Sequence, residues 1–273
     1  MTDQARALRA ARPAGVAFPE PLTEASALVI GSGKGGVGKS LVAVTLASSL
    51  AAAGRRVLLV DADFNLGTLH VLLGVRPAVQ PEDLLEPEVD AESVIIPVAH
   101  NLWLMPAPSG AESVQRLGPH DRARFHRRVA RLFPAYDAVV VDAAAGLDSA
   151  LRVAAMQAAR MVLVTTPEST ALTSAYALVK LVHGRLPLLP IDLLVNRTVD
   201  AAEGTLAATR MQEACSRFLG RTLRYLGAIP EDTTMRAALG SPEGLVDPAA
   251  SGPAQAALRA IVERTLLSAE ATG

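Results

Sequence analysis

Short runs of aliphatic residues alternate along the chain with longer stretches whose apolar positions recur at helical spacing. Residues 27–33, Ala-Leu-Val-Ile-Gly-Ser-Gly, predict a buried strand that runs into a glycine loop. Residues 39–54 predict a helix, which Gly54 is placed to end. Further strands are predicted at 55–63, 101–107, 137–146, 160–168, 191–198 and 224–232. Near-continuous apolar strands joined by helices predict an α/β fold, a doubly wound, mostly parallel sheet with helices on both faces.

Polar side chains gather where these strands and the first helix meet their loops. They are Lys39, Asp61, Asp63, Asp142, Glu168, Asn196 and Asp232. In an open α/β sheet the ligand lies beyond the carboxyl ends of the strands. The pattern therefore predicts one site at that edge of the sheet.

Two segments do not follow the sheet pattern. Residues 1–12 predict a short helix, and the proline-broken residues 13–24 predict a linker. We therefore expect one folded domain over residues 25–273. Inside it, residues 75–98 predict a long connection with one short helix.

Composition narrows the class of protein. The chain has 273 residues, half of them hydrophobic, which is enough for one large core. A net charge of −1 gives no global field that attracts nucleic acid or anionic lipid, so we expect no direct DNA binding. The single Cys215 excludes a disulfide framework and a cysteine-only metal site within one chain. The N-terminus has no apolar core and the apolar runs are too short to span a bilayer, so we expect a cytoplasmic protein.

A phosphate-binding loop is the most specific motif. Residues 33–40, Gly-Lys-Gly-Gly-Val-Gly-Lys-Ser, fit the pattern G-x-x-x-x-G-K-[ST] between an expected strand and an expected helix. Lys39 would reach the terminal phosphates, and the Ser40 hydroxyl would bind Mg²⁺. A glycine-rich turn without a ligand is the alternative, which the strand–helix context disfavours. The residues expected to contact nucleotide here are Gly33, Lys34, Gly35, Gly36, Val37, Gly38, Lys39, Ser40 and Leu41.

Three aspartates are candidates for the chemistry. Asp142 ends the run Ala-Val-Val-Val, where an aspartate of this kind of site holds Mg²⁺ through water. Asp61 and Asp63 close the second strand. We expect Asp63 to hold the attacking water and Asp61 to be a second candidate metal ligand. His70, close by, is interpreted as a surface or packing residue.

The loop also carries a second lysine, Lys34. The stretch Lys-Gly-Gly-Val-Gly-Lys-Ser at 34–40 resembles the deviant Walker A motif of the ParA/MinD family of ATPases. In that family the extra lysine reaches across a two-fold interface to the partner subunit's phosphates. The resemblance implies ATP and ADP with Mg²⁺ as cofactors, an ATP-dependent homodimer, and Lys34, Lys39 and Asp63 as catalytic residues. By position alone, Lys34 also fits a solvated loop lysine.

Within this family the chain resembles the FlhG group, which regulates flagellar number and placement. The resemblance lies in residues 61–75, 105–110, 141–150, 165–181, 194–197 and 227–232. It implies that the adenine is held by Asn196, Arg197, Pro230, Glu231 and Asp232. The group usually carries Gly, Asn and Asp where this chain has Asn65, Thr68 and His70, and Ser174 stands where an Asp is common. Residues 61–75, which resemble the first switch segment and the helix after it, contain Asn65, Thr68 and His70. All four departures leave the phosphate ligands unchanged.

The resemblance extends to the N-terminus, where it implies a protein partner. Asp3, Gln4, Leu8 and Arg9 fit the DQAxxLR motif with which FlhG proteins activate FlhF, a GTPase related to the signal-recognition particle. A frayed terminus is the alternative. The resemblance also implies flagellar partners of the C-ring or a flagellar transcription regulator, and a place at the inner face of the membrane near the cell pole with weak or indirect contact.

Other functions stay open at this point. A MinD-type septum-site ATPase, a ParA-type partitioning ATPase and an ATP-gated adaptor with negligible turnover are the alternatives. A partitioning ATPase needs a basic DNA-binding patch, and residues 120–133 are the candidate. Phe125, Val129 and Leu132 would face the core there, which leaves the arginines on a solvated face. The final helix, within 252–270, is interpreted as core-facing rather than membrane-bound.

Overall fold

The computed structural model describes residues 27–63, 67–86, 88–108, 118–147, 158–233, 246 and 252–264. Within this part of the chain, one eight-stranded sheet has the strand order β3-β4-β2-β5-β1-β6-β7-β8. All neighbouring strands are parallel except β3 and β4. The strands are β1 (Ala27–Gly31), β2 (Val57–Ala62), β3 (Ile96–Ala99), β4 (Leu102–Met105), β5 (Ala138–Ala143), β6 (Ala158–Thr165), β7 (Ile191–Thr198) and β8 (Arg224–Pro230).

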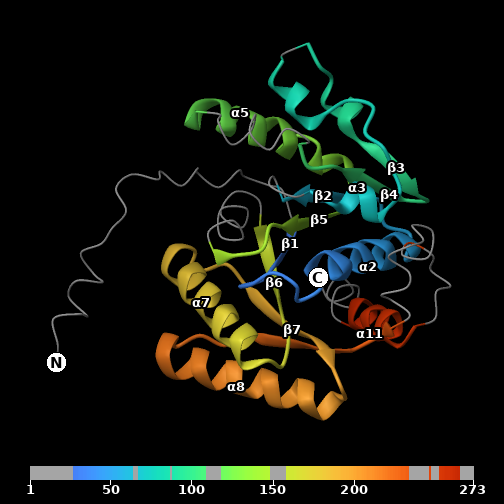
Figure 1. Ribbon diagram of the computed structural model, residues 1–273. Coiled ribbons are helices and arrows are strands. Elements are labelled where there is room, and N and C mark those ends of the chain that lie inside the picture. The colour runs from blue at the N-terminus through green and yellow to red at the C-terminus, as the bar shows by residue number, and fades with distance from the viewer. Residues whose placement is uncertain are drawn as a thin grey trace.

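Helices cover both faces of the sheet. The α-helices are α2 (Lys39–Ala52), α3 (Leu69–Leu72), α5 (Pro119–Ala130), α7 (Ser169–Arg185), α8 (Ala201–Leu219) and α11 (Pro253–Val262). Short 3₁₀ helices are η1 (Pro81–Leu85), η2 (Ala91–Val94) and η3 (Phe133–Ala135). In Figure 1, α7 and α8 lie on one side of the central strands, and α2 and α11 lie on the other.

The central strands are mostly apolar because both of their faces are buried. In β5, Val139 and Val141 belong to the hydrophobic cluster that contains Leu178 of α7 and Met211 of α8. Val140 points the other way, into the cluster that contains α2 and α11. This alternation of burial, without a polar face, is what distinguishes a sheet covered twice from a half-exposed one. The predicted doubly wound architecture is confirmed.

The connection at 75–98 is where the prediction is wrong. It contains two 3₁₀ helices rather than one short helix, and it leads into an unpredicted edge strand, β3. That strand runs antiparallel to β4 and alternates between half-buried and exposed residues. It contains Pro97, which only an edge strand accommodates. Four residues with a proline give too weak a pattern to predict a strand.

Helix α11 closes the face that carries α2. Leu258, Ile261 and Val262 are buried there, and the helix packs on α2 and β8. The core-facing interpretation is confirmed for this described stretch. None of the described helices is long and apolar enough to cross a membrane.

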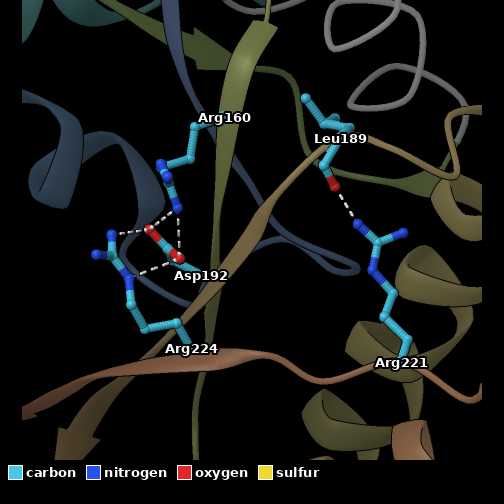
Figure 2. Close-up of polar contacts among 5 residues, drawn as sticks. All are labelled: Arg160, Leu189, Asp192, Arg221 and Arg224. Carbon is cyan, nitrogen blue, oxygen red and sulfur yellow. Dashed lines mark hydrogen bonds and ion pairs between the residues drawn. The ribbon is translucent and has the colours of Figure 1, made fainter.

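An ionic cluster joins the amino ends of three strands, at the edge of the sheet away from the phosphate loop. Asp192 of β7 is buried and accepts hydrogen bonds from Arg160 of β6 and Arg224 of β8 (Figure 2). Nearby, Arg221 donates to the carbonyl oxygen of Leu189. The charge of Asp192 is already paired with the two arginines. We therefore interpret the cluster as a link between the three strands rather than as a binding site.

Candidate nucleotide-binding site

The phosphate loop runs from β1 into α2, and two of its glycines have no room for a side chain. A Cβ on Gly33 would lie 2.1 Å from the carbonyl oxygen of Ser174 in α7. Gly38 has a φ of 86°, and its Cβ would lie 2.3 Å from Nδ2 of Asn196. The loop is therefore pressed against α7 on one side and against the end of β7 on the other.

The N-terminus of α2 is prepared for an anion. Its N-cap is Gly38, and among the described residues no side chain caps it and no acidic residue lies in its first turn. The backbone N–H groups of that turn are thus left for a ligand, and the helix dipole adds positive potential. This arrangement fits the phosphates of a nucleotide.

A buried ion pair lies directly behind the loop. Nζ of Lys39 is 2.5 Å from Oδ1 of Asp142 and 3.4 Å from Oγ of Ser40. Burial raises the pKa of the Asp142 carboxyl, and the charge of Lys39 opposes that rise. Lys39, the predicted phosphate ligand, is thus brought together with Ser40 and Asp142, two of the three predicted magnesium ligands. A hydroxyl, a carboxylate and phosphate oxygens are the usual donors to Mg²⁺ at such sites, so the residues present fit the ion.

Asp61 faces the same place from the neighbouring strand. It is paired with Asp142 in the register of β2 and β5. Its Oδ1 accepts from the backbone N–H of Asp63, and its Oδ2 accepts from that of Leu69, each at 3.0 Å. Burial raises the pKa of Asp61 to about 6. Both oxygens therefore anchor the backbone on either side of the first switch segment, a role that the sequence did not indicate.

Lys34 points away from this ion pair. Its Nζ donates to Oε2 of Glu168 at 2.7 Å and to Oγ1 of Thr170 at 3.1 Å. Hydrogen bonding to Lys34 lowers the pKa of the Glu168 carboxyl. The side chain of Lys34 is 32% exposed, whereas that of Lys39 is 7% exposed. The two lysines of one loop thus occupy different environments.

The ends of β7 and β8 complete the site. Asn196 is buried, and its Nδ2 donates to the carbonyl oxygen of Val37 at 2.8 Å. Arg197 follows with a left-handed backbone, at φ 57°. The N–H of Glu231 donates to Thr198, which sets the loop after Pro230 beside the end of β7. Asp232 accepts from the N–H of Ala254 at the start of α11.

Some predicted residues lie outside the described part of the chain. These are the proposed partner-binding residues Asp3, Gln4, Leu8 and Arg9, and the switch residue Asn65. Sequence reasoning also missed Glu168 and Thr170 as partners of Lys34. Glu168 was noted only as a polar residue near a strand end, because nothing in a linear pattern pairs residues 134 positions apart.

The chain matches the CobQ/CobB/MinD/ParA nucleotide binding domain over residues 28–244. It is 32% identical over 237 residues to the antiactivator FleN of Pseudomonas aeruginosa, covering 87% of this chain and 85% of FleN. It is also 30% identical to the flagellum site-determining protein YlxH of Helicobacter pylori, covering 77% of this chain and 71% of YlxH.

This chain belongs to the MinD/ParA family of ATPases. Its similarity to FleN and YlxH makes it an FlhG/FleN-type member of that family. The MinD protein of Pyrococcus horikoshii complexed with Mg-ADP has a TM-score of 0.71 and 27% identity to this chain. That match covers 89% of this chain and 97% of the other. MinD/ParA-family ATPases use ATP and ADP with Mg²⁺, which is the set of cofactors that the resemblance implied for this chain.

Proposed function

We propose that this ATPase is a nucleotide-dependent dimerisation switch that regulates the number or placement of flagella. Its similarity to a flagellum site-determining protein and to an antiactivator supports the flagellar assignment. The dimerisation switch rests on one observation. Lys34 is partly exposed, and it is bound to Glu168 and Thr170 rather than turned towards Lys39 and Asp142.

In the proposed cycle each lysine changes its partner. Lys39 gives up Asp142 when it binds the phosphates of its own subunit's nucleotide, and Asp142 and Ser40 would then hold Mg²⁺. When bound, the ion neutralises charge on the phosphate oxygens. Lys34 leaves Glu168 and reaches the phosphates of the partner subunit, as a cation supplied in trans does in other phosphoryl-transfer enzymes. Asp63 orients the attacking water, and Asp61 keeps the backbone around it in position.

Hydrolysis then loosens the dimer, because the nucleotide is part of the interface. The rate of ATP hydrolysis therefore sets how long such a dimer lasts. We infer that the N-terminal residues 1–12 stimulate an FlhF-like GTPase, with Gln4 orienting water or phosphate in the GTPase site. Further proposed partners are a C-ring protein or a flagellar transcription regulator. The protein would bind them in the cytoplasm, near the membrane at the cell pole.

Dimerisation is tested by light scattering on an Asp63→Ala variant, which keeps the phosphate ligands but loses the residue that orients water. We expect a dimer with ATP and a monomer with ADP. Lys39→Ala is the matched control and should stay monomeric with either nucleotide, because it loses the cation that holds phosphate. If Asp63→Ala binds ATP yet remains a monomer across micromolar concentrations, the shared site is refuted.

The GTPase partner is tested with a peptide of residues 1–15. Added to a cognate FlhF that is dimeric and loaded with GTP, the peptide should raise GTP turnover. The same peptide with Gln4→Ala should lose most of this effect, because the residue that orients water is gone. In the full chain, Gln4→Ala should leave ATP binding unchanged. No change of GTP turnover with the unmodified peptide would remove this activity from the proposal.

A further inference from the structure

Three arginines of helix α5, Arg124, Arg127 and Arg128, and its C-cap residue Arg131 lie near the η1–η2 connection. Two of them hold that connection in place. Arg128 donates to the carbonyl oxygens of Leu84, Glu86 and Val89, and Arg124 donates to that of Leu85. The solvated-face interpretation of these arginines is therefore wrong for this pair. Carbonyl oxygens are neutral, so none of these four contacts neutralises charge, and Asp121, 3.6 Å from Arg124, is an acidic partner of this pair in the described part of the chain.

The other two arginines, Arg127 and Arg131, are exposed. They are one helical turn apart and so lie on the same face of the helix. Among the described residues, the side chain of neither arginine makes a hydrogen bond or an ion pair. The Nε of Arg124 is buried and has no hydrogen-bond partner in the described part of the chain. This face of the helix thus has guanidinium N–H donors without hydrogen-bond acceptors, and positive charges without acidic partners, among the described residues.

A hollow opens at this cluster. A cavity of about 390 Å³ is lined by Leu85, Arg124, Arg127, Arg128 and Arg131. A second cavity of about 320 Å³ shares Arg128 and Arg131 with the first, and Glu88 and Asp90 also line it. In Figure 1 the helix lies beside the η1 segment at one end of the molecule, with the strands between it and α11. We name the two cavities together the arginine groove.

We propose that the arginine groove binds a short acidic peptide segment of a partner protein, with carboxylates held by Arg127 and Arg131. Guanidinium groups match carboxylates as planar, two-pronged donors. Leu85 offers an apolar wall for the aliphatic part of a glutamate side chain. Glu88 and Asp90 limit how far negative charge can extend along the groove. They favour a segment with a few carboxylates over a nucleic acid, whose phosphates continue at every nucleotide.

The probe for this site is a fluorescein-labelled peptide of ten glutamates, with a ten-glutamine peptide and a ten-nucleotide oligothymidine as comparisons. Binding to the full chain is followed by fluorescence anisotropy at two salt concentrations. The test variant is Arg127→Glu with Arg131→Glu. The matched control is Lys180→Glu with Arg210→Glu, which makes the same change of net charge at exposed positions on α7 and α8.

The glutamate peptide should bind the wild-type chain, and its Kd should rise by about tenfold or more in the groove variant, because two charge-assisted contacts are lost. The control variant should change the Kd by less than about twofold, because it alters only the net charge of the protein and salt screens that long-range effect. ATP affinity and the unfolding midpoint should match the wild type in both. If the groove variant is unfolded, Arg127→Gln with Arg131→Gln replaces it, with the same expected loss. Absent binding to the wild type, equal weakening in both variants, or tighter groove-dependent binding of the oligonucleotide would each overturn the proposal.

Discussion

Lys34 and Lys39 lie five positions apart in one loop, yet their surroundings give them different chemistry. Lys39 is enclosed with a buried carboxylate, so its charge is available only to a group that enters the phosphate site. Lys34 is partly exposed and bound to side chains at the start of α7, from which it can be withdrawn at little cost. The sequence predicted the role of Lys39 from its spacing. The partners of Lys34 in its own subunit lie at the start of α7. They reach Lys34 only because α7 packs against the loop, and no local sequence pattern predicts that packing.

Gly33 is the residue at which that approach is closest. Gly33→Ala would place a methyl group against the Ser174 carbonyl and push the loop away from α7. We expect the free energy of unfolding to fall by about 1–3 kcal/mol, the usual effect of overpacking, and ATP affinity to fall with it. Urea denaturation and binding of a fluorescent ATP analogue measure the two effects.

Gly184→Ala is the control for this prediction. Gly184 lies in the same helix as Ser174, and a Cβ there meets nothing within 4 Å. Alanine at this position should therefore raise the free energy of unfolding by up to about 1 kcal/mol through helix propensity. If the Gly33→Ala protein has the free energy of unfolding and the ATP affinity of the wild type, the loop does not depend on its contact with α7.

At the scale of elements, the strands of the central sheet were predictable because they are apolar and buried on both faces. The predicted range of β7 is the observed one, and β1, β2 and β5 differ from prediction only at their ends. The edge strand β3 and the 3₁₀ helices η1 and η2 were not predictable. They are short, and their contacts are with distant parts of the chain: η1 is bound by arginines of α5, and β3 is paired with β4.

The Asp192 cluster joins β6, β7 and β8 through side chains rather than backbone (Figure 2). Asp192→Asn removes the charge that two arginines share while it keeps the shape of the side chain. We expect the free energy of unfolding to fall by about 1–3 kcal/mol, at the lower end for a buried ion pair because both arginines are partly exposed. Binding of ATP should not change, since the cluster lies at the amino ends of the strands. Urea unfolding and nucleotide titration measure both.

The control is Asp137→Asn, which weakens the exposed ion pair with Arg56. Its effect on stability should be much smaller, because water screens exposed charges. Should Asp192→Asn and Asp137→Asn lower stability equally, the buried cluster would have no special part in holding the three strands together.

At the scale of the whole molecule, the phosphate loop, Lys39, Ser40 and Asp142 come together with Asn196 at the end of β7. Lys34 of the same loop is partly exposed and bound to Glu168. In the proposed dimer, a second copy of the chain would supply its Lys34 to the phosphates. The fold was predictable from sequence, whereas the assembly depends on the direction of one lysine side chain and so needs a test in solution.

The most direct test of Lys34 acting in trans is the ATP turnover of an equal mixture of Lys34→Ala and Asp63→Ala chains. Each variant alone lacks either the partner's lysine or the residue that orients water, so each should be inactive. In a mixed dimer, the Lys34→Ala subunit keeps its own Asp63 and receives Lys34 from its partner, which completes one site. Random pairing makes about half of the dimers mixed, so we predict about a quarter of the wild-type rate. A mixture no faster than the two variants measured separately would contradict a lysine shared between subunits.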